Sequence, residues 1–408
     1  MDEKRKEIID SLLDIIHDFR CEELDFRLDR SHIEKWLEQF DSRYQDVILQ
    51  ETVTIFQDWY CNRERILDFI KDVLRCLKER YGYETDAELF GNVSFPSCSL
   101  KGMSQVQILQ MLAHYSVETA QRMMLQCTNT SVSHFVYIDD GIYTGKTALK
   151  EIASLLELLP ENSTLDTFFI FGCTNGINYA NKMLKQSAAD KKVKLSILRW
   201  KNLANNRRSH RSEDGLTVEI EPHRCLWPYV SLKELPEISA FERDYISSSK
   251  VHEFHLYRED DWMTDKGVFT NHLNRNIVER EFLLKGIELT KYRKEDSGML
   301  PLGFDSWPSF GLGSFCATDL NISNTAPLVL WWGNIKKDGS VLDSWYPLLP
   351  RRIGGIEAVL DPEMYDYWDY EDDTDYQDGY NTCPDCGRKI NSENDGGNGF
   401  CCFCAWNH

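Results

Sequence analysis

The sequence predicts an α/β protein whose core is a parallel sheet flanked by helices. Between residues 134 and 198, apolar stretches of strand length alternate with segments of helical periodicity, a pattern typical of a doubly wound sheet. The first of these stretches, residues 134–138, leads through two adjacent carboxylates and a glycine-containing turn into an apolar helical pattern over residues 148–159. Two Cys-x-x-Cys pairs after residue 382 indicate a separate metal-binding module.

Composition limits the class of protein. A chain of 408 residues with 42% hydrophobic and 12% aromatic content is sufficient for one large or two ordinary domains with an additional module. The formal net charge of -20 argues against extensive coating of nucleic acid. No apolar run approaches the roughly 20 residues of a membrane span, and the first ten residues lack a signal-peptide h-region. We therefore expect a cytoplasmic protein with no membrane partner and, despite 13 cysteines, no disulfide scaffold.

Residues 1–90 are predicted to form an N-terminal helical cap on this core. Apolar residues recur at helical spacing over residues 8–19, and two further helices are expected over residues 45–59 and 63–81. Ser31 and Glu34 have the spacing of a capping box for a helix in between. We interpret His32 as a surface or packing histidine and not as a ligand.

The stretch over residues 134–147 carries the main functional signal. Asp139 and Asp140 follow the apolar strand, and Tyr143, Thr144, Gly145, Lys146 and Thr147 lead into the helix. Gly145-Lys146-Thr147 suggests a P-loop, but the first glycine of that motif would fall at Asp140, where a carboxylate would repel a triphosphate. A ribose 5-phosphate fits better, with its phosphate on the backbone of the turn and its hydroxyls facing the carboxylates. The plain alternative is a solvated strand end followed by an ordinary helix cap.

This stretch resembles the phosphoribosyl pyrophosphate (PRPP) loop of type I phosphoribosyltransferases, in which Asp-Asp precedes Thr-Gly-x-Thr. The resemblance implies a type I phosphoribosyltransferase-like sheet, catalytic roles for Asp139 and Asp140, and a substrate accompanied by Mg²⁺. Gly141 and Tyr143 depart from the family pattern, which has aliphatic and small residues there.

The segments before and after this motif are interpreted from their order in the chain. Lys101, Gly102 and Ser104, before a helix expected over residues 105–124, match the position of the pyrophosphate loop, although a plain loop explains them equally. Further strands are expected over residues 167–173 and 194–198, with a helix over 175–185 between them. The basic stretch over residues 199–211 is either a solvated loop or a phosphate or nucleic-acid contact.

Residues 296–352 are rich in glycine, proline and aromatic side chains, which marks a folded functional loop region. Trp331 and Tyr346 are candidates for stacking on a base and Arg351 for binding phosphate, while aromatic packing on the sheet is the alternative. Pro301-Leu302-Gly303-Phe304, Trp331-Trp332 and residues 345–351 are similar to the phosphoribosyltransferase-like family of prokaryotic conflict systems. That resemblance implies an anti-phage effector whose protein partner comes from the same defence locus, sometimes a retron reverse transcriptase with its nucleic acid.

The remaining residues read as an acidic linker (356–381) and a zinc ribbon (382–408). Residues 361–380 contain nine Asp or Glu and no Lys or Arg, so they form either a solvated linker or a docking strip for a basic partner. Cys383, Cys386, Cys401 and Cys404 have the spacing of a closed, structural Zn²⁺ site.

These observations predict a phosphoribosyltransferase-like domain over residues 91–355. Its leading interpretation is an enzyme that acts at the ribosyl C1 of PRPP or a nucleotide. The main alternative is an inactive module that senses a nucleotide or ribose phosphate and regulates a partner. Ordinary base salvage is a third interpretation, which leaves the additional helical, aromatic and zinc-binding parts without a use.

Overall fold

The computed structural model describes residues 3–21, 27–97, 104–115, 132–205, 223–248, 256–258, 263–293, 298–336, 339 and 341–351. These residues divide into two compact units. One unit contains the described residues up to Asn62 and those from Asn205 onward, and the other runs from Arg63 to Ala204. The domains expected from the sequence (1–90, 91–355, 356–381 and 382–408) are each one continuous stretch of chain, and their limits stay a prediction.

The unit from Arg63 to Ala204 contains the predicted parallel sheet. Its four strands lie in the order β2 (Val93–Ser94), β3 (His134–Ile142), β4 (Thr164–Cys173) and β5 (Lys194–Leu203). Every neighbouring pair is parallel, and Tyr137 of β3 lies opposite Thr167 of β4, which lies opposite Ile197 of β5. Strand β5 continues five residues beyond the predicted end at Leu198, because its ladder with β4 extends to Leu203.

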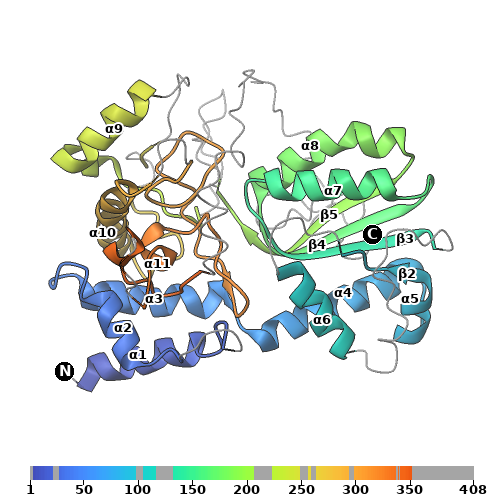
Figure 1. Cartoon of the computed structure of the whole chain (residues 1–408), viewed down its shortest axis with the longest axis horizontal. Helices are drawn as coiled ribbons and strands as arrows, with labels where there is room; N and C mark the ends of the chain where they lie inside the picture. Colours follow the sequence, from blue (N-terminus) through green and yellow to red (C-terminus); the bar gives the residue numbers. More distant parts are fainter. Residues whose placement is uncertain are drawn as a thin grey trace. The chain divides into compact units, whose positions relative to one another are not determined.

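Helices cover both faces of this sheet (Figure 1). They are α4 (Arg63–Tyr81), α5 (Asp86–Asn92), α6 (Ser104–Tyr115), α7 (Lys146–Leu158) and α8 (Thr174–Asp190). Helix α7 joins β3 to its neighbour β4, and α8 joins β4 to its neighbour β5, so both connections run in the same direction across the sheet. Right-handed crossovers of this kind place both helices on one face. Helices α4 and α6 lie on the other face. Because both faces are covered, β4 is buried along almost its whole length, as its apolar sequence predicts.

A buried carboxylate joins α4 to the amino-terminal half of the sheet. Asp166 of β4 is fully buried and accepts a hydrogen bond from the Tyr81 hydroxyl at 2.5 Å. It also accepts hydrogen bonds from Arg80 and Ser196. A buried carboxylate with these partners stabilises the packing of the helix on the strands, and it lies at the opposite end of β4 from the edge where ligands bind in such sheets.

Helices make up most of the regular secondary structure of the other unit. Its helices are α1 (Glu3–Ile16), α2 (Arg30–Leu37), α3 (Gln45–Trp59), α9 (Pro236–Ser248), α10 (His272–Thr290) and α11 (Leu328–Trp331), with 3₁₀ turns η2 (Val230–Glu234) and η4 (Val341–Ser344). Helix α3 packs against α1, α2 and α10. Strands β1 (Tyr60–Cys61) and β6 (Ala317–Thr318) form a short parallel pair in this unit.

The predicted capping box of α2 is wrong. The helix begins at Arg30, and the Asp29 side chain accepts a hydrogen bond of 2.8 Å from the backbone N–H of His32. Asp29 therefore occupies the cap position, and Ser31 already lies inside the helix. A carboxylate at this position also interacts favourably with the positive end of the helix dipole.

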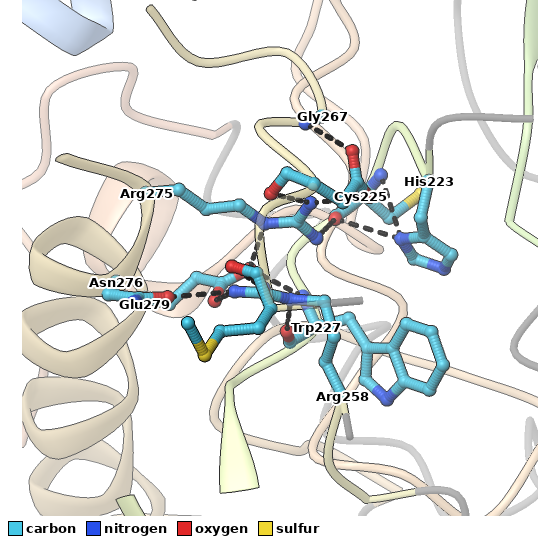
Figure 2. A network of polar contacts seen from close by, with 10 residues as sticks. His223, Cys225, Trp227, Arg258, Gly267, Arg275, Asn276 and Glu279 are labelled. Carbon is cyan, nitrogen blue, oxygen red and sulfur yellow. Dashed lines mark hydrogen bonds and ion pairs between the residues drawn. The ribbon is translucent and has the colours of Figure 1, made fainter. Parts of the chain in front are cut away.

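A buried ionic network holds the irregular segments of this unit against α10 (Figure 2). Glu279 pairs with Arg275 at 2.7 Å and with Arg258 at 2.9 Å, and all three side chains are fully buried. Asp265 pairs with Arg275 at 2.8 Å. The network contains two guanidinium groups and two carboxylates, so it is neutral as a whole, which is the condition for burying such charges without a large cost.

Membrane spans are not found in the part of the chain that the structure describes, since none of its helices combines the necessary length and apolar character.

Candidate functional site

The two carboxylates predicted to be catalytic lie within strand β3. The strand does not end at Ile138 but continues to Ile142, and Asp139 lies opposite Phe169 of β4. The backbone of Asp139 is therefore held in the ladder with β4, and Asp140 follows it in the same strand near the strand's carboxyl end. In a parallel α/β sheet this edge is where ligands bind.

Asp139 is fixed by three hydrogen bonds. Its Oδ1 accepts from the Ser104 hydroxyl at 3.0 Å and from the backbone N–H of Asp140 at 2.8 Å. Its Oδ2 accepts from the Tyr137 hydroxyl at 3.1 Å. Burial raises the pKa of Asp139, and these hydrogen bonds oppose that shift because they stabilise the ionised form. The carboxylate thus has one defined orientation.

Ser104 brings the start of α6 to this strand. It is the first residue of the helix and the one member of the predicted pyrophosphate loop that the structure describes. Lys101 and Gly102 lie outside the described residues. The hydrogen bond between Ser104 and Asp139 places the helix start beside the carboxylates, where the order of the sequence motifs predicts a pyrophosphate loop.

The predicted phosphate loop joins β3 to α7. Gly145 has a left-handed backbone with φ +80°, which favours glycine, and α7 begins at the next residue, Lys146. No side chain caps this helix. The first turn of α7 therefore places backbone N–H groups at the loop, and a helix N-terminus of this kind can bind an anion.

A second helix begins at the same place. Helix α8 follows β4 directly and also has no side-chain cap. The backbone of Gly176 in its first turn approaches the Gly145 and Tyr143 backbones so closely that a side chain on Gly145 or Gly176 would collide with main-chain atoms. The positive ends of α7 and α8 consequently converge on one loop, which strengthens the attraction for a phosphate group.

The two departures from the family pattern are explained by one contact. The Tyr143 ring lies over Gly141, and a Cβ atom at residue 141 would lie 2.5 Å from Cε2 of that ring. Any side chain at residue 141 would therefore force the Tyr143 ring to move from this position. The pair places an aromatic ring over the residue that follows the two carboxylates.

Four polar side chains that the sequence analysis missed lie in this unit close to the predicted motif. Thr174 donates a hydrogen bond to Asn202 at 3.2 Å, and these residues connect the carboxyl ends of β4 and β5. The Tyr137 hydroxyl lies within hydrogen-bonding distance of Asp139 and of Glu151 of α7. The sequence offered one sign of such residues, which is a polar residue at a position where the helical pattern expects an apolar one. Glu151, between Ala148 and Ile152, is an example.

Trp331, Tyr346 and Arg351 lie in the other compact unit. Trp331 is fully buried and donates from Nε1 to the Ala326 carbonyl at 2.7 Å. The Arg351 guanidinium lies 5.3 Å from the centre of the Trp331 ring and donates to the Ile322 carbonyl at 2.8 Å. These contacts favour the alternative of aromatic packing, and a role in binding a base or phosphate stays a prediction.

Within the described ranges, no group of three or more His, Cys, Asp or Glu side chains is arranged to hold a metal ion. The predicted zinc ligands Cys383, Cys386, Cys401 and Cys404 lie outside those ranges, as do Arg207, Arg208 and Arg211 of the basic stretch.

Comparison with known proteins decides the family. A family model described as PRTase-CE matches residues 33–351, which is 319 of the 408 residues. The chain belongs to the PRTase-CE family. The match includes the β3–α7 motif and the aromatic segment, so the resemblance to a phosphoribosyltransferase-like effector family that the sequence predicted is confirmed. The mixed α/β architecture with parallel strands flanked by helices agrees with a phosphoribosyltransferase-like fold. Neither a curated protein nor a solved structure matches the chain.

Proposed function

We propose that this PRTase-CE protein is an anti-phage defence effector that acts at the ribosyl C1 of PRPP or of a nucleotide. The observation that carries the proposal is the convergence of two uncapped helix starts, α7 and α8, on the loop that follows Asp139 and Asp140. This arrangement suits a sugar phosphate, whose anionic phosphate would lie at the loop and whose ring hydroxyl groups would lie at the carboxylates.

In this proposal the backbone from Thr144 to Thr147 binds the 5-phosphate, and Asp139 and Asp140 accept hydrogen bonds from the ribose hydroxyls. Bond cleavage at C1 develops positive charge on the sugar, and carboxylates held nearby stabilise that charge. Ser104 at the start of α6 contributes to the end of the site where pyrophosphate would leave. The hydrogen bonds that orient Asp139 reduce the reorganisation needed as charge develops.

Magnesium fits the donors that this site offers. Mg²⁺ prefers oxygen ligands and is commonly held by one or two carboxylates together with substrate phosphates. Asp139 and Asp140 are adjacent, and both are partly exposed. When bound with the substrate, the ion would supply charge neutralisation at the leaving phosphates.

The second candidate function is a sensing module that binds a nucleotide or ribose phosphate without turnover and regulates a partner. The Tyr143–Gly141 contact favours it, because an aromatic ring then lies over the residue after the carboxylates, where the family pattern has smaller groups. The partner would be a protein from the same defence locus, including a reverse transcriptase with its nucleic acid. The acidic linker and the zinc ribbon, with structural Zn²⁺ on Cys383, Cys386, Cys401 and Cys404, are the parts proposed to dock it.

The test compares the wild type with a double variant, Asp139→Asn with Asp140→Asn. This change retains the size of the side chains but removes both charges, so the barrier should rise by a few kcal/mol and activity should fall about a hundredfold. The measurements are calorimetric binding of PRPP and common nucleotides with Mg²⁺, metabolite profiling and phage protection in cells. A double variant that protects fully would exclude the enzyme and leave the sensing module. Wild-type protein that binds no ribose 5-phosphate compound would exclude both.

A further inference from the structure

The Tyr137 hydroxyl lies between two carboxylates. It is 3.1 Å from Oδ2 of Asp139 and in close hydrogen-bonding contact with Oε2 of Glu151. Tyr137 is fully buried and Glu151 is 2% exposed. Tyr137 precedes Asp139 by two residues, so both side chains are on the same face of β3. Helix α7 packs on the face that carries Tyr137 and supplies Glu151.

The number of protons in this arrangement is constrained. A phenol has one hydrogen to donate, while an ionised carboxylate only accepts. If Asp139 and Glu151 were both ionised, one of them would face the Tyr137 oxygen with no hydrogen between them, and two negative charges would lie on either side of one buried hydroxyl group. One of the two carboxyl groups must therefore carry a proton for both contacts to be hydrogen bonds.

The surroundings indicate which group is protonated. Burial raises the pKa of Asp139, but this residue is partly exposed, and the hydrogen bonds that it accepts from Ser104 and from the Asp140 backbone favour its charged form. Glu151 lies almost completely away from solvent, which disfavours a charge. The consistent arrangement has a protonated Glu151 donating to the Tyr137 oxygen and the Tyr137 hydroxyl donating to Asp139.

We infer that Glu151 and Tyr137 are positioning residues for the ribose site, linked as Glu151–Tyr137–Asp139 by two hydrogen bonds in one direction. The chain of bonds holds the Asp139 carboxylate as an oriented anion. It also connects that carboxylate to α7, the helix whose first turn is proposed to bind the phosphate. The residues proposed to bind the ribose and those proposed to bind the phosphate are thereby held in fixed positions relative to each other. This inference rests on the proposed function.

The test uses two variants with opposite expected results. Glu151→Gln retains a donor of the same shape as the protonated acid and should bind PRPP with Mg²⁺ within about threefold of the wild type. Tyr137→Phe removes the donor to a charged group and should weaken binding about tenfold or more. Glu157→Gln, an exposed glutamate on the same helix, is the matched control and should have no effect. Circular dichroism establishes that each variant is folded.

Infrared spectroscopy tests the proton directly. The wild type at neutral pH should show the C=O stretch of a protonated carboxyl group, and Glu151→Gln should lose that band while Glu157→Gln retains it. Absence of the band, binding by Tyr137→Phe equal to the wild type, or a loss in Glu151→Gln as large as in Tyr137→Phe would overturn the inference. If wild-type protein binds neither PRPP nor nucleotides, the proposed function fails, while the infrared band still decides where the proton lies.

Discussion

The ionic network on α10 offers the sharpest test of how the helical unit is stabilised. Glu279 accepts hydrogen bonds from Arg275, from Arg258 and from the backbone N–H of Trp227 at 3.0 Å (Figure 2). Glu279→Gln retains the shape of this side chain but removes its charge. The two guanidinium groups would then be balanced by Asp265 alone, which leaves one positive charge in the interior.

The expected cost follows from this change in charge. Removing one partner from a buried ion pair costs about 3–5 kcal/mol, because the other charge remains desolvated and uncompensated. Glu288 lies on the same helix and pairs with Lys285 at 3.0 Å, but its side chain is 56% exposed. Glu288→Gln should therefore change the free energy of unfolding by no more than about 1 kcal/mol.

Hydrogen exchange monitored by mass spectrometry under increasing urea measures both changes locally. In Glu279→Gln, amides of α10 should exchange faster by the amount that corresponds to this free energy, while amides of α7 in the other unit serve as an internal reference. A Glu279→Gln protein whose α10 is as protected as that of Glu288→Gln would refute the argument that the network stabilises this unit.

Three further predictions concern the loop, pH and zinc. Gly141→Val should weaken PRPP binding because its side chain collides with the Tyr143 ring, and adding Tyr143→Thr should restore it; a double variant no better than the single one would contradict this explanation. Burial lowers the pKa of His32, whose Nε2 donates to the Leu348 carbonyl at 2.7 Å. As the pH falls below 6.5, unfolded chains take up a proton that folded His32 does not, so thermal stability should fall; an equal pH dependence in His32→Gln would exclude this cause. Elemental analysis should find one zinc per chain, with loss in Cys383→Ser, and wild-type protein without zinc would contradict the assignment.

Local sequence patterns were sufficient for much of the fold. Helices α3 and α4 have the bounds that their apolar periodicity predicts, and β3, β4 and β5 occur where continuous apolar runs predicted strands, whereas the two-residue strands β1, β2 and β6 were not predicted. The position of the Asp139–Asp140 pair and of the loop before α7 also followed from the sequence. These features depend on residues a few positions apart, so the signal is contained in the local chain.

Contacts between distant residues decided the rest. Strand β3 includes Asp139 and Asp140, contrary to their poor strand propensity, because β4 supplies a hydrogen-bonding partner as far as Ile142. Glu151 lies on a helix and Tyr137 on a strand, so no repeating pattern in the sequence indicates the hydrogen bond between them. The departures at Gly141 and Tyr143, which the sequence shows as two separate anomalies, become a single packed contact only when the turn folds the ring back over the strand.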